Sequence, residues 1–285
     1  MQVFDYSSLS SQKNQIVQAF YDRGIIAIQG VPGYVKAYAD FIESSRSFIN
    51  LTEETRAQYT PRDAYGRGWS YGIETFNGVT DAFKGSYYAT YPEEDAILPN
   101  IWPCQDVPGF KQNYLNLVEI IFRTGKEIQS LLGINIKDVL SVSRMLYYGP
   151  VHDSGEVEWC GEHRDHGLLT GLCPGVCFLK GERIPKPPGT GLFIRGEEIF
   201  APGDALLFQI GEVAELITNG AVTATEHEVR KAVGGCERYG FAHFIAPKSN
   251  YAMESVLSKY NDRFSQGLSY GEWHNRSYAK YNEIP

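Results

Sequence analysis

The chain has 285 residues, of which 43% are hydrophobic and 13% aromatic, which is enough apolar material for one large buried core. Its formal net charge is −8 and no run of Lys and Arg stands out, so it lacks the clustered cations with which proteins grip nucleic acid. The first residues do not resemble a signal peptide, and no apolar run approaches membrane-spanning length. The five cysteines have spacings unlike a disulfide framework. We therefore expect a reduced, cytoplasmic protein that binds neither nucleic acid nor membrane.

The first half of the chain is predicted to combine helices with a short strand. Apolar residues at helical spacing predict helices over residues 10–23 and 34–49, with the strand GIIAIQG (24–30) between them. Residues 60–109 are rich in Gly, Pro and Tyr and show little periodicity, so we expect a long functional loop, such as a lid or a pocket wall. The clearest helix is predicted over residues 110–132, where apolar side chains form one stripe.

The second half has a different pattern. Short apolar runs between Gly and Pro turns occupy residues 139–247 and predict a β-sandwich or barrel. A turn expected at Pro174 explains the spacing of Cys173 and Cys177 without a metal or redox role. The tail, 250–285, is expected to be helical and to pack back on the barrel.

The segment GEHRDHG places a histidine and a carboxylate two residues apart, at His163 and Asp165. Side chains alternate between the faces of a strand, so both are expected on one face, with Arg164 and His166 on the other. His227, in the later run TATEHEVRK, supplies a third donor. Two histidines and one carboxylate form the open-sided triad typical of non-haem Fe(II) oxygenases. An H-x-D pair by itself is more often just two surface or core polar residues.

Arg238 follows His227 by eleven positions and begins the run RYGFAHF. A 2-oxoglutarate molecule that chelates iron has a second carboxylate, which is costly to bury without a partner, and an arginine fork is its natural bidentate partner. The alternative is a surface arginine in an ion pair, but the residues after Arg238 have the pattern of a buried strand. The other histidines, His152, His243 and His274, are expected to be structural.

Nearly the whole chain resembles the 2-oxoglutarate/Fe(II) oxygenases of the isopenicillin N synthase type. The likeness lies in DRGIIAIQG, the long central helix, RMLYYGP, HRDHG, APGDALLFQIG, EHEVRK and ERYGFAHFIAP. It implies a mostly β fold, a double-stranded β-helix (jelly roll) core with flanking helices. The implied single oxygenase domain has an N-terminal α/β region (1–135), the jelly-roll catalytic core (136–248) and a C-terminal helical tail (249–285).

This resemblance also implies the cofactors: Fe(II), 2-oxoglutarate as cosubstrate, and O₂. HRDHG and EHEVRK match the family's ligand segments, so the implied catalytic metal ligands are His163, Asp165 and His227. Much of the family has Arg-x-Ser where this chain has Arg-Tyr-Gly, so the serine hydroxyl is missing and a tyrosine is expected to compensate. The residues implied around 2-oxoglutarate are Arg238, Tyr148, Arg144, Phe208 and Phe244.

Within the family the chain looks most similar to the ethylene-forming enzyme type, at RMLYYGP, at IWPC (101–104) and at YGE (270–272). Those enzymes bind arginine beside the iron. On this likeness Glu74 and His166 are the residues expected on the substrate side. The alternative for Glu74 is a solvated loop acid, and His166 stands where that type has a tyrosine.

These features predict an enzyme that oxidises a small-molecule substrate, by hydroxylation in the first instance, and releases succinate and CO₂. Three alternatives stay open. One is an ethylene-forming or arginine-oxidising enzyme, and the second is an oxidase of this fold that does not use 2-oxoglutarate. The third is a jelly-roll binding protein without chemistry.

Overall fold

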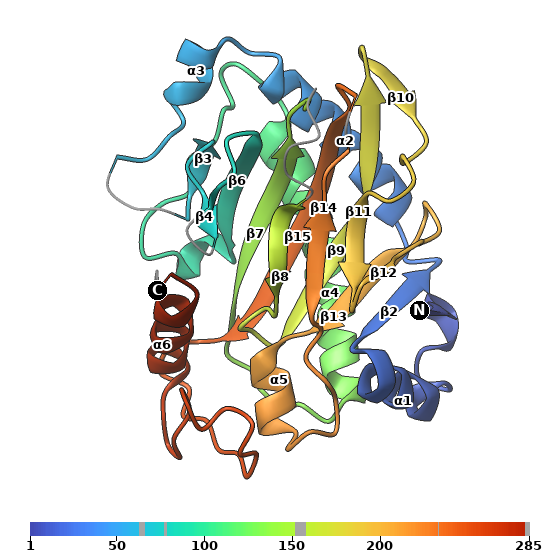
Figure 1. Cartoon of the computed structure of the whole chain (residues 1–285), viewed down its shortest axis with the longest axis vertical. Coiled ribbons are helices and arrows are strands. Elements are labelled where there is room, and N and C mark those ends of the chain that lie inside the picture. Colours follow the sequence, from blue (N-terminus) through green and yellow to red (C-terminus); the bar gives the residue numbers. More distant parts are fainter. Residues whose placement is uncertain (63–65, 77–78, 152–157, 233, 283–285) are drawn as a thin grey trace.

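The computed structural model describes residues 1–62, 66–76, 79–151, 158–232 and 234–282. Two β-sheets form its centre, and the helices α2 and α4 lie behind the larger one (Figure 1). The larger sheet has the strand order β1 (Gln2–Asp5), β2 (Ile25–Gln29), β13 (Leu206–Ile210), β9 (Leu169–Leu179), β15 (Glu237–Pro247), β7 (Val139–Tyr148), β6 (Lys84–Tyr91) and β3 (Gly68–Tyr71), with β10 (Glu182–Ile184) paired to β9.

The smaller sheet has the order β12 (Glu197–Glu198), β11 (Gly191–Ile194), β14 (His227–Arg230) and β8 (Glu158–His163). A separate pair joins β4 (Thr75–Phe76) to β5 (Val79–Thr80). This two-sheet architecture with flanking helices confirms the mostly β jelly-roll expectation.

The helices confirm the predicted ones and add a few short ones. They are α1 (Lys13–Arg23), α2 (Tyr34–Ile49), α3 (Glu53–Ala57), α4 (Phe110–Leu131), α5 (Glu212–Ile217) and α6 (Tyr270–Asn282), with 3₁₀ turns at Tyr6–Ser8 and Glu93–Asp95. None of the described helices combines the length and the apolar composition that a membrane crossing requires.

Two glycines bring α4 close to the larger sheet. A Cβ atom on Gly171 of β9 would lie 2.2 Å from Cγ2 of Ile121, and one on Gly125 of α4 would lie 2.5 Å from Cδ1 of Ile245. Both isoleucines are completely buried. The stripe of α4 therefore packs on β9 and β15 at a distance that only glycine permits.

The expectation of a functional loop over 60–109 is wrong where β3 and β6 lie. β6 pairs with β7 from Lys84 opposite Tyr148 to Tyr91 opposite Ser141, so it extends the larger sheet. Its first six residues are buried in succession, so the sequence shows no alternation of polar and apolar residues. Only glycine fits at position 85, because a Cβ there would lie 2.2 Å from the indole of Trp69.

The turn expected at Pro174 is also wrong, because β9 runs through it as one strand. The pairing with β15 instead shifts register between Tyr239 and Phe241, which is a β-bulge. A bulge suits proline, which has no N–H for the ladder. Cys173 and Cys177 are buried free thiols, as the structural interpretation required.

The C-terminal tail is helical only in its second half, at α6. Residues 250–269 form turns and one bridge between Ala252 and Ser269, a region without helical periodicity. The tail nevertheless packs back on the body of the protein, because Arg263 forms two hydrogen bonds of 3.0 Å with the buried carboxylate of Glu212 in α5.

Candidate metal centre and cavity

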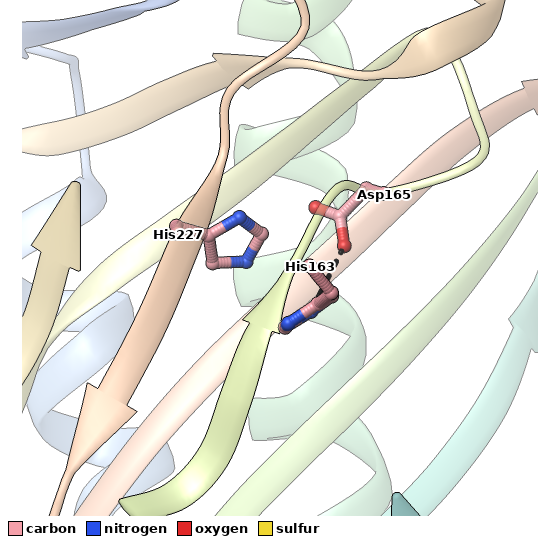
Figure 2. Close-up of side chains that lie close together, drawn as sticks. All are labelled: His163, Asp165 and His227. Atoms are coloured by element: carbon pink, nitrogen blue, oxygen red, sulfur yellow. Dashed lines mark ion pairs between the residues drawn. The ribbon is translucent and has the colours of Figure 1, made fainter. Parts of the chain in front are cut away.

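The side chains of His163, Asp165 and His227 converge on one point (Figure 2). One ligand atom from each lies within 4.8 Å of the others, and Nε2 of His163 is 3.8 Å from Oδ1 of Asp165. His163 ends β8 and His227 begins β14, and these two residues are direct partners in the smaller sheet. A group of this composition and size can hold one metal ion.

Asp165 reaches this point by a different route from the one expected. β8 ends at His163, so strand alternation does not orient Asp165. Two hydrogen bonds hold it instead, since Thr170 Oγ1 and Gln209 Nε2 each donate to Oδ2 over 2.6 Å. Oδ1 is left facing His163. Arg164 forms an ion pair with Glu226.

The electrostatics of the three groups suit a metal. Burial opposes ionisation of Asp165, but His227, His163 and the two hydrogen bonds outweigh it and hold the pKa of this carboxyl below its usual value. Burial and the neighbouring His163 lower the pKa of His227 to about 4, which keeps this imidazole neutral. Its Nδ1–H donates to the carbonyl of Thr225 over 3.1 Å, and that of His163 to the carbonyl of Gly161 over 2.8 Å. In each imidazole Nε2 is therefore the nitrogen that could donate to a metal ion, and Nε2 of His227 lies 3.2 Å from Nε2 of Gln209.

A cavity of about 320 Å³ opens beside these three residues and is lined from both sheets. Arg238 reaches into it from β15 with only 7% of its surface exposed. Among the described residues its Nε and Nη1 atoms find no hydrogen-bond partner, and its guanidinium lies 5.1 Å from the centre of the Tyr148 ring. A buried cation in this state is costly unless a bound anion pairs with it. The donor set thus fits a carboxylate of 2-oxoglutarate, and the surface ion pair considered from sequence is wrong.

Glycine makes room for this guanidinium. A Cβ on Gly175, at the bulge of β9, would lie 2.3 Å from Nε of Arg238. Gly240, which replaces the serine of Arg-x-Ser, is different, because a Cβ there would meet nothing closer than 3.9 Å. The backbone of the bulge at Gly175 therefore lies directly against the guanidinium of Arg238.

Of the other residues expected around 2-oxoglutarate, three line the cavity and one does not. Tyr148, Arg144 and Phe244 line the cavity. Phe208 does not, and its ring lies instead against Gly125 and Gly171 beneath α4, so that expectation is wrong. Side chains alternate along β13, and it is the neighbours of Phe208, Leu207 and Gln209, that face the cavity.

Neither residue expected on the substrate side is among the described residues that line the cavity. Glu74 is not a solvated acid, because its side chain is 11% exposed and forms ion pairs with Arg144 and, over 3.0 Å, with Lys84. The ring of His166 lies 5.6 Å from that of His274, and burial lowers the pKa of His166 to about 3.

Sequence reasoning missed Gln209, Thr170 and Lys84. Gln209 had a usable signal, a polar residue inside the apolar strand LLFQI. Lys84 had none, because its strand was not recognised. His243 is the buried, hydrogen-bonded histidine that was expected, with Nδ1 2.8 Å from Oγ of Ser143. His152 lies outside the described residues.

Comparison with known proteins agrees with this geometry. The family model of the 2OG-Fe(II) oxygenase superfamily matches residues 140–247. A probable iron/ascorbate oxidoreductase of Dictyostelium discoideum is 24% identical over 256 residues, which cover 72% of this chain and 67% of that protein. The 2-oxoglutarate-dependent dioxygenase 11 of Oryza sativa subsp. japonica is 25% identical over 80% of this chain and 64% of that protein. The chain thus spans about two thirds of the length of these relatives.

Solved structures share the fold. A full-length Neurospora crassa protein in complex with α-KG and thymine superposes with a TM-score of 0.75 at 19% identity, over 98% of this chain and 97% of that one. The dioxygenase for auxin oxidation in rice gives a TM-score of 0.70 at 15% identity, over 100% of this chain and 97% of that one. Together with the His-Asp-His group, the match of residues 140–247 shows an enzyme of the oxoglutarate-dependent dioxygenase kind, which uses Fe(II), 2-oxoglutarate and O₂.

Proposed function

We propose that this enzyme oxidises a small-molecule substrate, by hydroxylation, while 2-oxoglutarate is converted to succinate and CO₂. The observation that carries the proposal is the buried guanidinium of Arg238, which has two nitrogens without partners among the described residues and opens on the same cavity as His163, Asp165 and His227. The cavity volume of about 320 Å³ suits 2-oxoglutarate and a small molecule rather than a polymer.

In this proposal His163, Asp165 and His227 hold Fe(II), which when bound supplies the redox chemistry that couples O₂ to the oxidation of 2-oxoglutarate and substrate. Arg238 would bind the distal carboxylate of 2-oxoglutarate through charge-assisted N–H···O bonds. Tyr148, whose ring lies under the guanidinium, orients it.

Apolar side chains of the cavity wall exclude water from the site. Phe244, Leu207 and Leu172 give the cavity an apolar surface, which keeps water from the reacting centre. Arg144 faces the same space and is held by Glu74, so it stays a candidate for contact with cosubstrate or substrate.

An arginine-oxidising, ethylene-forming activity is the second candidate, and Glu74 is its key residue. The carboxylate of Glu74 is already bound by Arg144 and Lys84, so an arginine substrate would compete with two cations of the chain itself. An oxidase that does not use 2-oxoglutarate would have no use for the buried Arg238.

The first test is an anaerobic titration of the Fe(II)-loaded protein with 2-oxoglutarate. We expect a weak visible charge-transfer band, followed in air by succinate release across a panel of metabolites. A correctly folded protein that gives no band would instead be a binding protein. Ethylene in the headspace that depends on arginine would favour the second candidate.

Arg238→Ala sharpens this test. The variant should raise the 2-oxoglutarate concentration needed for half-maximal succinate release at least about tenfold, since it removes a charge-assisted contact. Arg46→Ala is the matched control, because Arg46 also lies over an aromatic ring, 4.0 Å from the centre of Phe178, but is not among the residues that line the cavity. An unchanged requirement in Arg238→Ala would support the 2-oxoglutarate-independent oxidase.

A further inference from the structure

A buried cluster of Glu74, Lys84 and Arg144, here called the Glu74 cluster, lies beside the cavity where β6 meets β7. Nζ of Lys84 is 3.0 Å from Oε2 of Glu74, and Nη2 of Arg144 pairs with the same oxygen. The exposed fractions of the three side chains are 11%, 7% and 15% in the order named. Charges this well removed from water interact strongly with one another and with any ligand that reaches them.

Both carboxylate oxygens of Glu74, at the centre of the cluster, have partners within the chain. Oε1 of Glu74 accepts hydrogen bonds from Ser86 and, over 3.2 Å, from Tyr88, while Oε2 receives the two cations. Burial opposes its ionisation, but Arg144, Lys84 and Ser86 prevail and lower the pKa of Glu74 to about 2. The carboxylate therefore remains charged and is committed to groups of its own chain.

The cationic members of the cluster face the cavity. Lys84 and Arg144 line the cavity, whereas Glu74 is not among the described residues that line it. The charged residues of the described lining are four cations and one carboxylate: Lys84, Arg144, Lys186, Arg238 and Asp165. Lys186 is paired with Glu198, and the proposed function assigns Arg238 to 2-oxoglutarate and Asp165 to the metal. Among the described residues, the charged side chains that remain for a substrate are the cations Lys84 and Arg144.

An apolar floor connects these two cations to the metal centre. Arg144, Ala242, Leu172 and Leu207 pair in one continuous row across β7, β15, β9 and β13, and all four line the cavity. Gln209, two residues beyond Leu207, bonds Asp165. A substrate anchored at one end of the row can therefore extend along it toward the metal centre.

We infer that the substrate is a carboxylic acid with an apolar body, whose carboxylate binds Lys84 and Arg144 and whose body lies over Ala242, Leu172 and Leu207. This inference rests on the proposed function, because it takes Arg238 to be occupied by 2-oxoglutarate. It predicts the opposite charge preference from an arginine oxidase, since a cationic substrate would face two like charges.

Calorimetric titration of matched probes tests the inference. The protein is loaded anaerobically with Fe(II) and saturating 2-oxoglutarate, so that Arg238 cannot take the probe. Phenylacetate is compared with phenylacetamide, hexanoate with hexanamide, and arginine is titrated separately. We expect each acid to bind at least about tenfold tighter than its amide, because charge-assisted hydrogen bonds replace neutral ones, and arginine to bind no better than the amides.

Two variants should move this preference in opposite directions. Lys84→Met removes one of the two cations that the inference assigns to the substrate carboxylate, so the ratio of amide to acid dissociation constants should fall toward one. Glu74→Gln removes the only carboxylate of the Glu74 cluster, so the ratio should rise. Lys36→Met is the control, since Lys36 is an exposed residue of α2 paired with Asp40, and it should leave the ratio unchanged.

The outcomes separate the two proposals. If wild-type protein shows no charge-transfer band with Fe(II) and 2-oxoglutarate, the proposed function fails and this inference fails with it. If the band is present but acid and amide bind alike, no acid binds, or arginine binds best, only the inference is overturned. If Lys84→Met does not fold, as judged by its melting curve, Glu74→Gln alone decides, and an unchanged ratio there overturns the inference.

Discussion

The backbone N–H of Glu212 donates a hydrogen bond to the carbonyl oxygen of Asp165 over 2.8 Å. The side chain of Glu212 is completely buried and accepts two hydrogen bonds of 3.0 Å from Arg263, whose guanidinium lies 4.7 Å from the centre of the Trp273 ring. One residue of α5 thus connects a proposed metal ligand to the C-terminal segment, so that docking of this segment supports the metal centre.

Arg263→Met should therefore damage both stability and metal binding. It leaves the carboxylate of Glu212 buried without its partner, which should lower the free energy of unfolding in urea by about 3–5 kcal/mol. Mn(II) affinity should fall as well. The double variant Arg263→Met, Glu212→Gln removes both charges and should recover most of the loss. A double variant as unstable as the single one would contradict this explanation.

Gly175→Ala should raise the half-saturating concentration of 2-oxoglutarate, because the added Cβ would lie 2.3 Å from Nε of Arg238 and displace the guanidinium. Gly240→Ala is the matched control, since its Cβ has 3.9 Å of clearance and neither glycine has a left-handed φ. Succinate release as a function of 2-oxoglutarate measures both. Equal effects would mean that the close approach at Gly175 does not position Arg238.

Thr170→Val and Gln209→Leu should each weaken metal binding about 10–100-fold, the usual effect of removing a group that orients a metal ligand. Both residues donate to Oδ2 of Asp165 over 2.6 Å. Thr124→Val is the control for a buried threonine, because among the described residues its hydroxyl bonds only the Ile120 carbonyl within α4. Mn(II) titration followed by calorimetry gives the affinities, and unaltered affinity in both variants would remove the proposed roles.

His243 should make the stability of the metal-free protein depend on pH. Burial lowers the pKa of His243 to about 3 in the folded protein, whereas the unfolded chain has the ordinary value near 6.5. The unfolded state binds the extra proton between these values, so stability falls as pH drops from about 6.5 toward 3, by up to about 1.4 kcal/mol per pH unit. His243→Gln should flatten this part of the curve in urea unfolding from pH 7 to 5. Parallel curves would show that His243 does not titrate in this way.

Much of the proposed site could be predicted because its chemistry is concentrated in short segments. An imidazole and a carboxylate in HRDHG, a second histidine and an arginine, each near a β-run, have few explanations besides metal and keto-acid binding. The reason given for the orientation of Asp165 was nevertheless wrong. Hydrogen bonds from residues 5 and 44 positions away fix that side chain, and such distant partners leave no local pattern.

A further limit on prediction is burial on two faces. β6 and β13 are covered on both sides, so their sequences show no alternation that would reveal which side chains face the cavity. For this reason the sequence does not indicate that Lys84 faces the cavity, and it cannot correct the resemblance that implied Phe208 there. The ion pairs of Glu74 with Arg144 and Lys84 could not be predicted either, because those residues come from strands that the sequence pattern did not place beside Glu74.

The larger sheet takes both of its edges from the N-terminal third of the chain, β1 and β2 beside β13, and β6 and β3 beside β7. Segment 140–247, which matches the superfamily, contains the three proposed metal ligands, whereas Glu74 and Lys84 lie outside it. We therefore expect substitutions in the outer strands to change substrate specificity during evolution, while the proposed metal ligands in segment 140–247 stay the same.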